Sequence, residues 1–156
     1  MTTAIDHDNY SDAYLKQILS EVKTIALVGA SPRSERDSYR CMEALIDQGY
    51  QVFPVNPREV GTLILGQHCY ADLHSLTEAL GHPVDMVDIF RSSEAALGVT
   101  QEAIAIAAKV VWMQLEIINQ QAADLAEDAG IKVVMNRCPK IELEKGYQTG
   151  IKGEQA

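Results

Sequence analysis

Short apolar runs that alternate with amphipathic stretches constrain this chain more than any other feature of its sequence. Five runs are continuous and short enough to be strands buried on both faces: 24–28, 51–55, 84–90, 110–114 and 131–135. Apolar residues recur at helical spacing over 10–22, between Ser38 and Gly49, over 92–107 and over 119–129. The stretch 59–83 has a weaker pattern, for which we expect a short strand near 68–70 and a short helix near 75–80.

This alternation is typical of α/β proteins, in which helices cover both faces of a doubly wound parallel sheet. We therefore predict a Rossmann-type, three-layer α/β/α fold with right-handed crossovers. No repeat or linker divides the 156 residues, so we expect one domain over 1–156 with its core at about 12–145. Ligands of such sheets bind outside the carboxyl ends of the strands, so the residues after each strand are the candidates for a site.

The formal charge of −9, from 13 basic and 22 acidic side chains, argues against polyanionic partners. A field of this sign repels nucleic acids and anionic membrane surfaces, and we expect neither as a partner. No apolar stretch reaches the ~20 residues of a membrane span, and the first residues lack the apolar core of a signal peptide. The three cysteines are widely spaced and odd in number, which indicates free thiols and a cytoplasmic location.

The arginines are distributed less evenly than the net charge suggests. All six follow a predicted strand: Arg33, Arg36, Arg40, Arg58, Arg91 and Arg137. Three lysines lie at or just before strand starts, at the opposite edge: Lys23, Lys109 and Lys132. Because a guanidinium matches phosphate oxygens two at a time, six at one edge favour a ligand that carries phosphate. The alternative is that each arginine pairs with nearby acids, such as Glu35, Asp37 and Glu59, in a solvated rim.

Two loops after predicted strands refine the ligand class. Gly29-Ala30-Ser31 leads from the first strand toward a helix, where a glycine allows close backbone approach to a phosphate. This turn is not the three-glycine dinucleotide fingerprint, and an ordinary turn would look the same. The second strand ends Val55-Asn56-Pro57-Arg58, with an arginine where an NAD-binding domain usually has a carboxylate for the ribose. That difference favours a ribose with an additional phosphate, as in NADP and coenzyme A.

Several blocks of the chain together resemble a known family. They are Gly29-Ala-Ser31, Arg36-Asp-Ser-Tyr39, Gly49-Tyr-Gln-Val-Phe-Pro-Val-Asn-Pro57, Val84-Asp-Met-Val-Asp-Ile-Phe-Arg91, Val111-Trp-Met-Gln114, 129–131 and 135–142. In this order they resemble the small stand-alone bacterial coenzyme A-binding proteins, relatives of the coenzyme A-binding domain of the succinyl-CoA synthetase alpha subunit. The resemblance covers roughly residues 12–145 and implies a Rossmann-type fold that binds coenzyme A or an acyl-CoA.

The resemblance also assigns roles to residues of this chain. Gly29, Ala30, Ser31, Ser38, Tyr39 and Arg40 would hold the diphosphate or the start of the pantetheine arm, with Arg36 among the phosphate-binding arginines. Asn56, Pro57 and Arg58 would lie along the adenosine and its 3′-phosphate. The opposite wall would come from Ile89, Phe90 and Arg91, and Gln114 would meet the pantetheine amides.

The synthetase reaction does not carry over with the resemblance. The chain ends before any domain with a phosphorylated histidine, and we expect His7, His68, His74 and His82 at the surface. The sequence shows no nucleophile–base couple, carboxylate pair or metal-ligand cluster, so we predict no catalytic residues, no metal and no catalysis by the chain alone.

Two other functions remain open on the sequence alone. One is an NADP-dependent oxidoreductase or dinucleotide-binding module, and the other is a protein-interaction module with a vestigial cleft. Cys138 has two interpretations as well. Its thiol, near Arg137 and Lys140, could have a lowered pKa and form a mixed disulfide with coenzyme A. A small buried side chain that packs the end of the sheet is the interpretation we favour.

Overall fold

The computed structural model of this protein describes residues 5–146. Residues 1–4 and 147–156, which the predicted single domain includes, lie outside the described residues, as does the start of the N-terminal segment considered for a signal peptide. Among residues 5–146, no helix is long and apolar enough to cross a membrane.

Five parallel strands form the central sheet, as predicted. In space their order is β2 (Gln51–Val55), β1 (Thr24–Val28), β5 (Met86–Ile89), β6 (Val110–Met113) and β7 (Lys132–Val134). The chain first steps from β1 to β2 and then returns across β1 to β5, so the winding reverses beside β1. Val28 is in register with both Val55 and Ile89, which brings the ends of these three strands level. Their following loops therefore meet at one edge.

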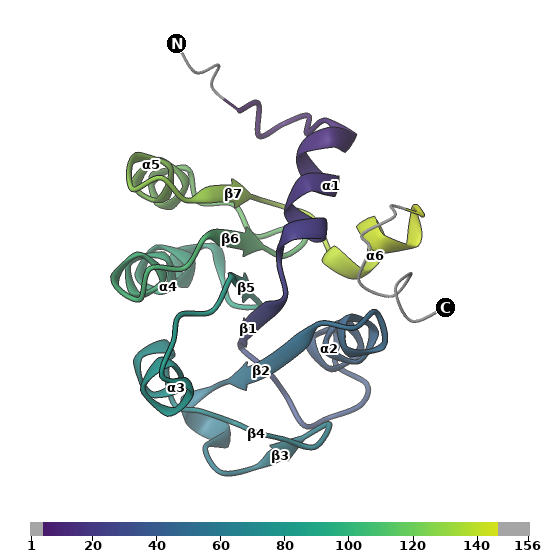
Figure 1. Cartoon of the computed structure of the whole chain (residues 1–156), viewed down its shortest axis with the longest axis vertical. Coiled ribbons are helices and arrows are strands. Elements are labelled where there is room, and N and C mark those ends of the chain that lie inside the picture. The colour runs from purple at the N-terminus through teal and green to yellow at the C-terminus, as the bar shows by residue number, and fades with distance from the viewer. Residues whose placement is uncertain (1–4, 147–156) are drawn as a thin grey trace.

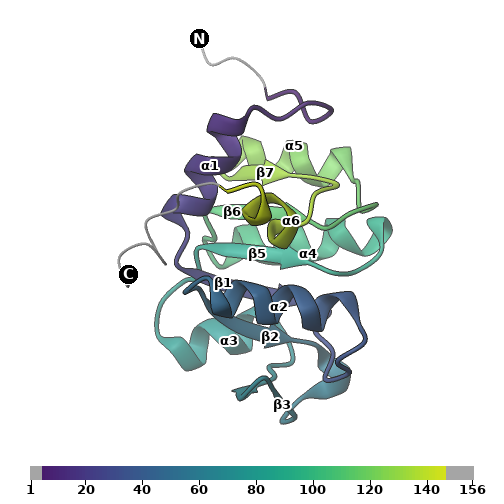
Figure 2. The ribbon, with the colours of Figure 1, turned by 90° about the vertical axis from the view of Figure 1, so that its right-hand side faces the viewer.

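Helices cover both faces of the sheet, which confirms the three-layer α/β/α expectation (Figures 1 and 2). One face carries α1 (Asp12–Glu21), α2 (Asp37–Asp47) and α6 (Pro139–Glu144), and the other carries α3 (Leu73–Leu80), α4 (Ser93–Ala105) and α5 (Gln120–Asp128). The strands are buried on both sides, and an apolar cluster fills each layer. This explains why the strand runs are continuous rather than alternating.

Polar side chains cap the N-termini of three of the predicted helices. Ser11 accepts a hydrogen bond from the Tyr14 amide, Ser92 from the Ala95 amide, and Asn119 from the Ala122 amide. Each bond satisfies one of the amides that a helix N-terminus leaves unpaired.

The structure differs from the sequence-based expectation in two segments. After β2, a 3-10 turn η1 (Pro57–Glu59) leads into an antiparallel hairpin of β3 (Leu63–Ile64) and β4 (Gln67–His68). The strand expected near 68–70 is only the end of this hairpin, with one bridge between Tyr70 and Val55. Helix α6 was not expected, because its six residues are too few to show a helical stripe.

Candidate ligand cleft at the carboxyl edge of the sheet

The ends of β1 and β5 approach each other at Gly29 more closely than any other residue would allow. A Cβ at position 29 would lie 2.1 Å from the backbone oxygen of Phe90, and Gly29 has a φ of +93°. Its amide donates to the carbonyl of Val55 at 2.8 Å, which also ties the turn to β2. Gly29 is therefore required by the convergence of three strand ends, at the edge where open α/β sheets generally bind their ligands.

A polar cavity of about 560 Å³ opens over this turn. Its cationic lining consists of three arginines, Arg33, Arg36 and Arg58. The remaining lining residues are Gly29, Ala30, Ser31, Asp37, Ser38, Asn56, Glu59 and Phe90. We call this space the arginine cavity. Its side chains carry three positive and two negative charges, so its net charge is opposite in sign to that of the whole chain.

Helix α2 presents its N-terminus at the arginine cavity. The residue that precedes the helix is Arg36, whose side chain makes no capping hydrogen bond. The first amides of an α-helix have no partner within the helix, and the helix dipole adds positive potential there. Because Asp37 and Ser38 of the first turn also line the cavity, these amides face a space that suits an anion.

Asn56 joins the two loops that form the cavity. Its side-chain amide donates to the Ala30 carbonyl at 2.9 Å, and its Oδ1 accepts from the Arg58 amide at 3.0 Å. Its backbone amide donates to Tyr70 at 2.8 Å. Both polar atoms of the Asn56 side chain therefore form hydrogen bonds within the protein. These bonds fix the backbone position of Arg58 relative to the Gly29–Ser31 turn.

A second cavity of about 470 Å³ adjoins the first through shared residues. Asp37 and Phe90 line both, and the second continues along Arg40, Cys41, Gln114, Leu115, Glu116, Ile117, Cys138, Lys140 and Ile141. We call it the thiol cavity. Leu115 and Ile141 are 45% and 40% exposed and form an apolar border along this space.

Cys138 and Gln114 are the buried polar groups of the thiol cavity. Hydrogen bonds from Cys41 and Gln114, together with the amides of Lys140 and Ile141, outweigh burial and lower the pKa of the Cys138 thiol to about 6. The pKa of Cys41 is raised well above its usual range, because the same hydrogen bond and burial both favour its neutral form. Cys138 was expected to be a buried packing residue; it is buried, but it also lines a cavity.

Most of the residues that the resemblance singles out line one of the two cavities. The arginine cavity has Gly29, Ala30, Ser31, Arg36, Ser38, Asn56, Arg58 and Phe90, and the thiol cavity has Arg40, Gln114 and again Phe90. Four predicted residues line neither. Arg91 is near, with its side chain over Gly29, and Pro57 begins the exposed turn η1. Tyr39 packs beside the core, and Ile89 is fully buried within it. The wall expected from Ile89 is formed by Phe90, because alternation along β5 turns the Ile89 side chain into the core.

Several residues that line the cavities were not among the predicted binding residues, and two of them, Glu59 and Cys138, bear on the ligand class. Glu59 lies in the arginine cavity, so the end of β2 does have a nearby carboxylate, contrary to the sequence-based interpretation. The turn η1 brings Glu59 into the cavity. The sequence motif that we considered ended at Arg58 and therefore did not include Glu59. For Cys138 the sequence suggested a lowered pKa only from the neighbouring bases Arg137 and Lys140, whereas the largest effects come from Cys41 and Gln114 in distant parts of the chain.

Among the described residues, lysines form ion pairs with acids, whereas arginines do not. Within residues 5–146, none of the ion pairs involves an arginine, so the alternative of arginines paired in a solvated acidic rim is not seen there. Arg137 turns away from the cleft, and its guanidinium lies 5.3 Å from the centre of the Tyr10 ring.

His7 was expected at the surface, but its side chain is largely buried between Tyr10 and Glu127.

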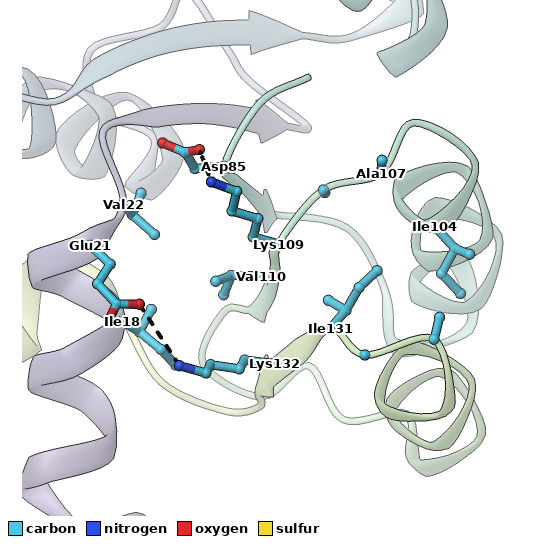
Figure 3. A pocket seen from close by; sticks show the side chains of 13 residues that line it. Ile18, Glu21, Val22, Asp85, Ile104, Ala107, Lys109, Val110, Ile131 and Lys132 are labelled. Atoms are coloured by element: carbon cyan, nitrogen blue, oxygen red, sulfur yellow. Dashed lines mark ion pairs between the residues drawn. The ribbon is translucent and has the colours of Figure 1, made fainter. Parts of the chain in front are cut away.

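A further cavity, of about 770 Å³, lies at the amino edge of the sheet (Figure 3). Its two lysines are each engaged by an acid: Lys109 pairs with Asp85 at 3.7 Å and Lys132 with Glu21 at 3.8 Å. Parallel α/β sheets bind ligands at the other edge, and the cations here are already compensated. The arginine and thiol cavities together are therefore the candidate ligand cleft.

The fold and this cleft define a Rossmann-type binding domain, and comparison with known proteins identifies its family. The family model described as the CoA binding domain matches residues 23–144, and the chain belongs to this family. The protein YneT of Bacillus subtilis (strain 168) is 37% identical over 133 residues, which are 85% of this chain and 94% of YneT.

Solved structures agree with this assignment. A hypothetical protein from Pyrococcus horikoshii OT3 is 36% identical, with a TM-score of 0.79 over 93% of this chain and 98% of its own. An acetyl-coenzyme A synthetase of Ca. Korarchaeum cryptofilum has a TM-score of 0.61 at 21% identity, over 76% of this chain and 27% of the synthetase. The latter similarity concerns the fold alone.

Proposed function

We propose that the protein binds coenzyme A, or an acyl-CoA, in the cleft at the carboxyl edge of the sheet, and that it does so without catalysing a reaction by itself. The observation that carries the proposal is the junction of two unlike cavities at Asp37 and Phe90. Coenzyme A is likewise divided, with a phosphorylated nucleotide at one end and a neutral, thiol-bearing pantetheine arm at the other.

Each part of this ligand has a complementary surface. The guanidiniums of Arg33, Arg36 and Arg58, which form no ion pair among residues 5–146, suit the phosphates together with the first amides of α2. The apolar border of the thiol cavity suits the pantetheine chain, and the Gln114 amide suits its peptide-like groups. Membership in the CoA-binding domain family supports the same ligand.

Parallel calorimetric titrations with coenzyme A, dephospho-coenzyme A, NAD and NADP test the proposal. We expect coenzyme A to bind most tightly, because of these four only it has both a pantetheine arm for the thiol cavity and a 3′-phosphate for the arginine cavity. No binding of coenzyme A at millimolar concentration would overturn the proposal, and tighter binding of NADP would favour a dinucleotide-binding module instead.

A charge-matched pair of variants tests the place of binding. Arg58→Ala removes a cation from the cleft, whereas Lys23→Ala removes one from the exposed amino edge of the sheet. Because a hydrogen bond to a charged group is worth about 1.5–3 kcal/mol, Arg58→Ala should weaken coenzyme A binding by roughly tenfold or more. Lys23→Ala should leave it nearly unchanged. If dephospho-coenzyme A and coenzyme A bind the unaltered protein equally, Arg58 does not hold the 3′-phosphate.

A further inference from the structure

The inner end of the thiol cavity holds two buried groups that face the same space. Cys138 and Gln114 are each 7% exposed, and both line the cavity. The Oε1 atom of Gln114 has no hydrogen-bond partner among residues 5–146. Because an unpaired buried oxygen is costly, this atom indicates that a donor from a ligand belongs beside the sulfur.

Groups from several elements lower the pKa of the Cys138 thiol: Cys41 on α2 first, then the Gln114 side chain and the backbone amides of Ile141 and Lys140. The Cys41 thiol also lies within hydrogen-bond distance of Asp88 Oδ2, at 3.8 Å. The charged side chains around the same cavity are Arg40, Lys140, Asp37 and Glu116, two of each sign. Behind Cys41 lies Asp88, whose pKa is raised well above its usual range because complete burial favours its neutral form. The surroundings therefore favour a thiolate, although no net positive charge faces it.

We propose that Cys138 undergoes thiol–disulfide exchange with the disulfide form of a pantetheine-bearing thiol, such as coenzyme A disulfide, and holds one half of it as a mixed disulfide. This inference rests on the proposed function, because the cleft must first bind the nucleotide end. The Cys138 thiolate attacks one sulfur of the bound disulfide and forms a Cys138–sulfur bond. The disulfide bond breaks, and the second coenzyme A leaves as a thiolate. One disulfide replaces another, so that no external oxidant or reductant is needed.

The donors at Cys138 favour this exchange over attack on a thioester. Acyl transfer needs donors placed at the carbonyl oxygen as it becomes negative. Here the amides of Ile141 and Lys140 lower the pKa of the Cys138 sulfur itself, so they stabilise a thiolate before attack. The free Oε1 of Gln114 can accept from an amide N–H of the pantetheine arm and align the terminal sulfur with Cys138.

The exchange is tested with the full-length chain, its Cys138→Ser and Cys138→Ala variants, and Cys69→Ala as the matched control. Cys69 is also buried, but it lies outside the thiol cavity, and burial raises its pKa. Each protein is incubated with coenzyme A disulfide and, separately, with glutathione disulfide. Intact-mass measurement detects the adduct, and the coenzyme A thiol released is quantified.

We expect one coenzyme A adduct on the unaltered protein and on Cys69→Ala, and none on either Cys138 variant. The rate with coenzyme A disulfide should exceed that with glutathione disulfide at least tenfold, because binding in the cleft holds the sulfur near Cys138. Release of a second coenzyme A thiol, with a Cys41–Cys138 disulfide left on the chain, would also support the inference, since it requires the same adduct. Equal rates with the two disulfides, or an adduct that persists in both Cys138 variants, would overturn it.

Calorimetry separates this inference from the proposed function. If coenzyme A binds the protein and its Cys138→Ser variant equally well but no adduct forms, the exchange is wrong and the binding function stands. If coenzyme A does not bind and Cys138 reacts with both disulfides alike, the binding function fails. If Cys138 instead accepts an acetyl group from acetyl-CoA, the exchange is overturned in favour of acyl transfer.

Discussion

The ionisation of Cys138 can be tested without any ligand. With a pKa of about 6 rather than the usual 9.0, its thiolate outnumbers its thiol about ten to one at pH 7. An unperturbed thiol would be ionised in about one chain in a hundred at that pH. Because only the thiolate is alkylated, the rate of iodoacetamide reaction at Cys138 should reach half its plateau near pH 6.

Cys41 is the largest contributor to this shift, so its removal gives the sharpest perturbation. A hydrogen bond to a charged group is worth about 1.5–3 kcal/mol, which corresponds to roughly one to two pKa units. In Cys41→Ala the midpoint of the alkylation profile should therefore rise by at least about one pH unit, whereas Cys69→Ala should leave it in place. Peptide-resolved mass spectrometry assigns each rate to its cysteine.

Protein stability provides an independent check of the same shift. The folded pKa of Cys138 lies below its unfolded value, so folding favours the thiolate. We compare the unfolding free energy of the unaltered protein with that of Cys138→Ser. The difference in favour of the unaltered protein should increase from about pH 6 to pH 9, and it should disappear as the pH falls through 6. An alkylation midpoint near 9 in the unaltered protein, or no change in Cys41→Ala, would refute the assigned hydrogen bonding.

Two further substitutions address the turn and the charge of the cleft. Gly29→Ala should lower the unfolding free energy by at least about 2 kcal/mol in denaturant titrations, because the new Cβ meets the Phe90 oxygen and φ is positive; stability within about 0.5 kcal/mol would contradict this contact. Asp37→Asn should strengthen coenzyme A binding roughly two- to fivefold by calorimetry, because it removes an acid from both cavities. The same substitution should lower the unfolding free energy by up to about 1 kcal/mol, because Asp37 interacts favourably with the dipole at the α2 N-terminus. If Asp37→Asn weakens coenzyme A binding instead, the phosphates do not lie beside Asp37.

The sheet could be predicted because its strands carry their own signal. A strand buried on both faces must be apolar throughout, and the runs at 24–28 and 51–55 coincide with β1 and β2 to the residue. Helix starts could be predicted for a similar reason, since Ser11 and Asn119 hydrogen-bond within their own first turns. These interactions are local, so neighbouring residues in the sequence contain the information.

The details of the cleft depended on contacts between distant residues and were less predictable. Cys41 and Cys138 are far apart in the chain, and only the packing of α6 beside α2 brings them together. A short helix such as α6 is stabilised by its tertiary contacts more than by its own pattern. The place of Glu59 depended likewise on the turn η1, which Pro57 begins and whose direction the sequence does not specify.

The two edges of the sheet show how a chain with a charge of −9 can suit an anionic ligand. At the amino edge, Lys109 and Lys132 lie against acids of neighbouring elements, so their charges are compensated locally. At the carboxyl edge, Arg33, Arg36 and Arg58 surround a cavity without an ion pair among residues 5–146. Net charge acts at a distance and disfavours a polyanion, which would lie over many acids at once. A small anion inside the cleft is governed by the guanidiniums and helix amides within a few ångströms, where solvent screening and the distant acids count least.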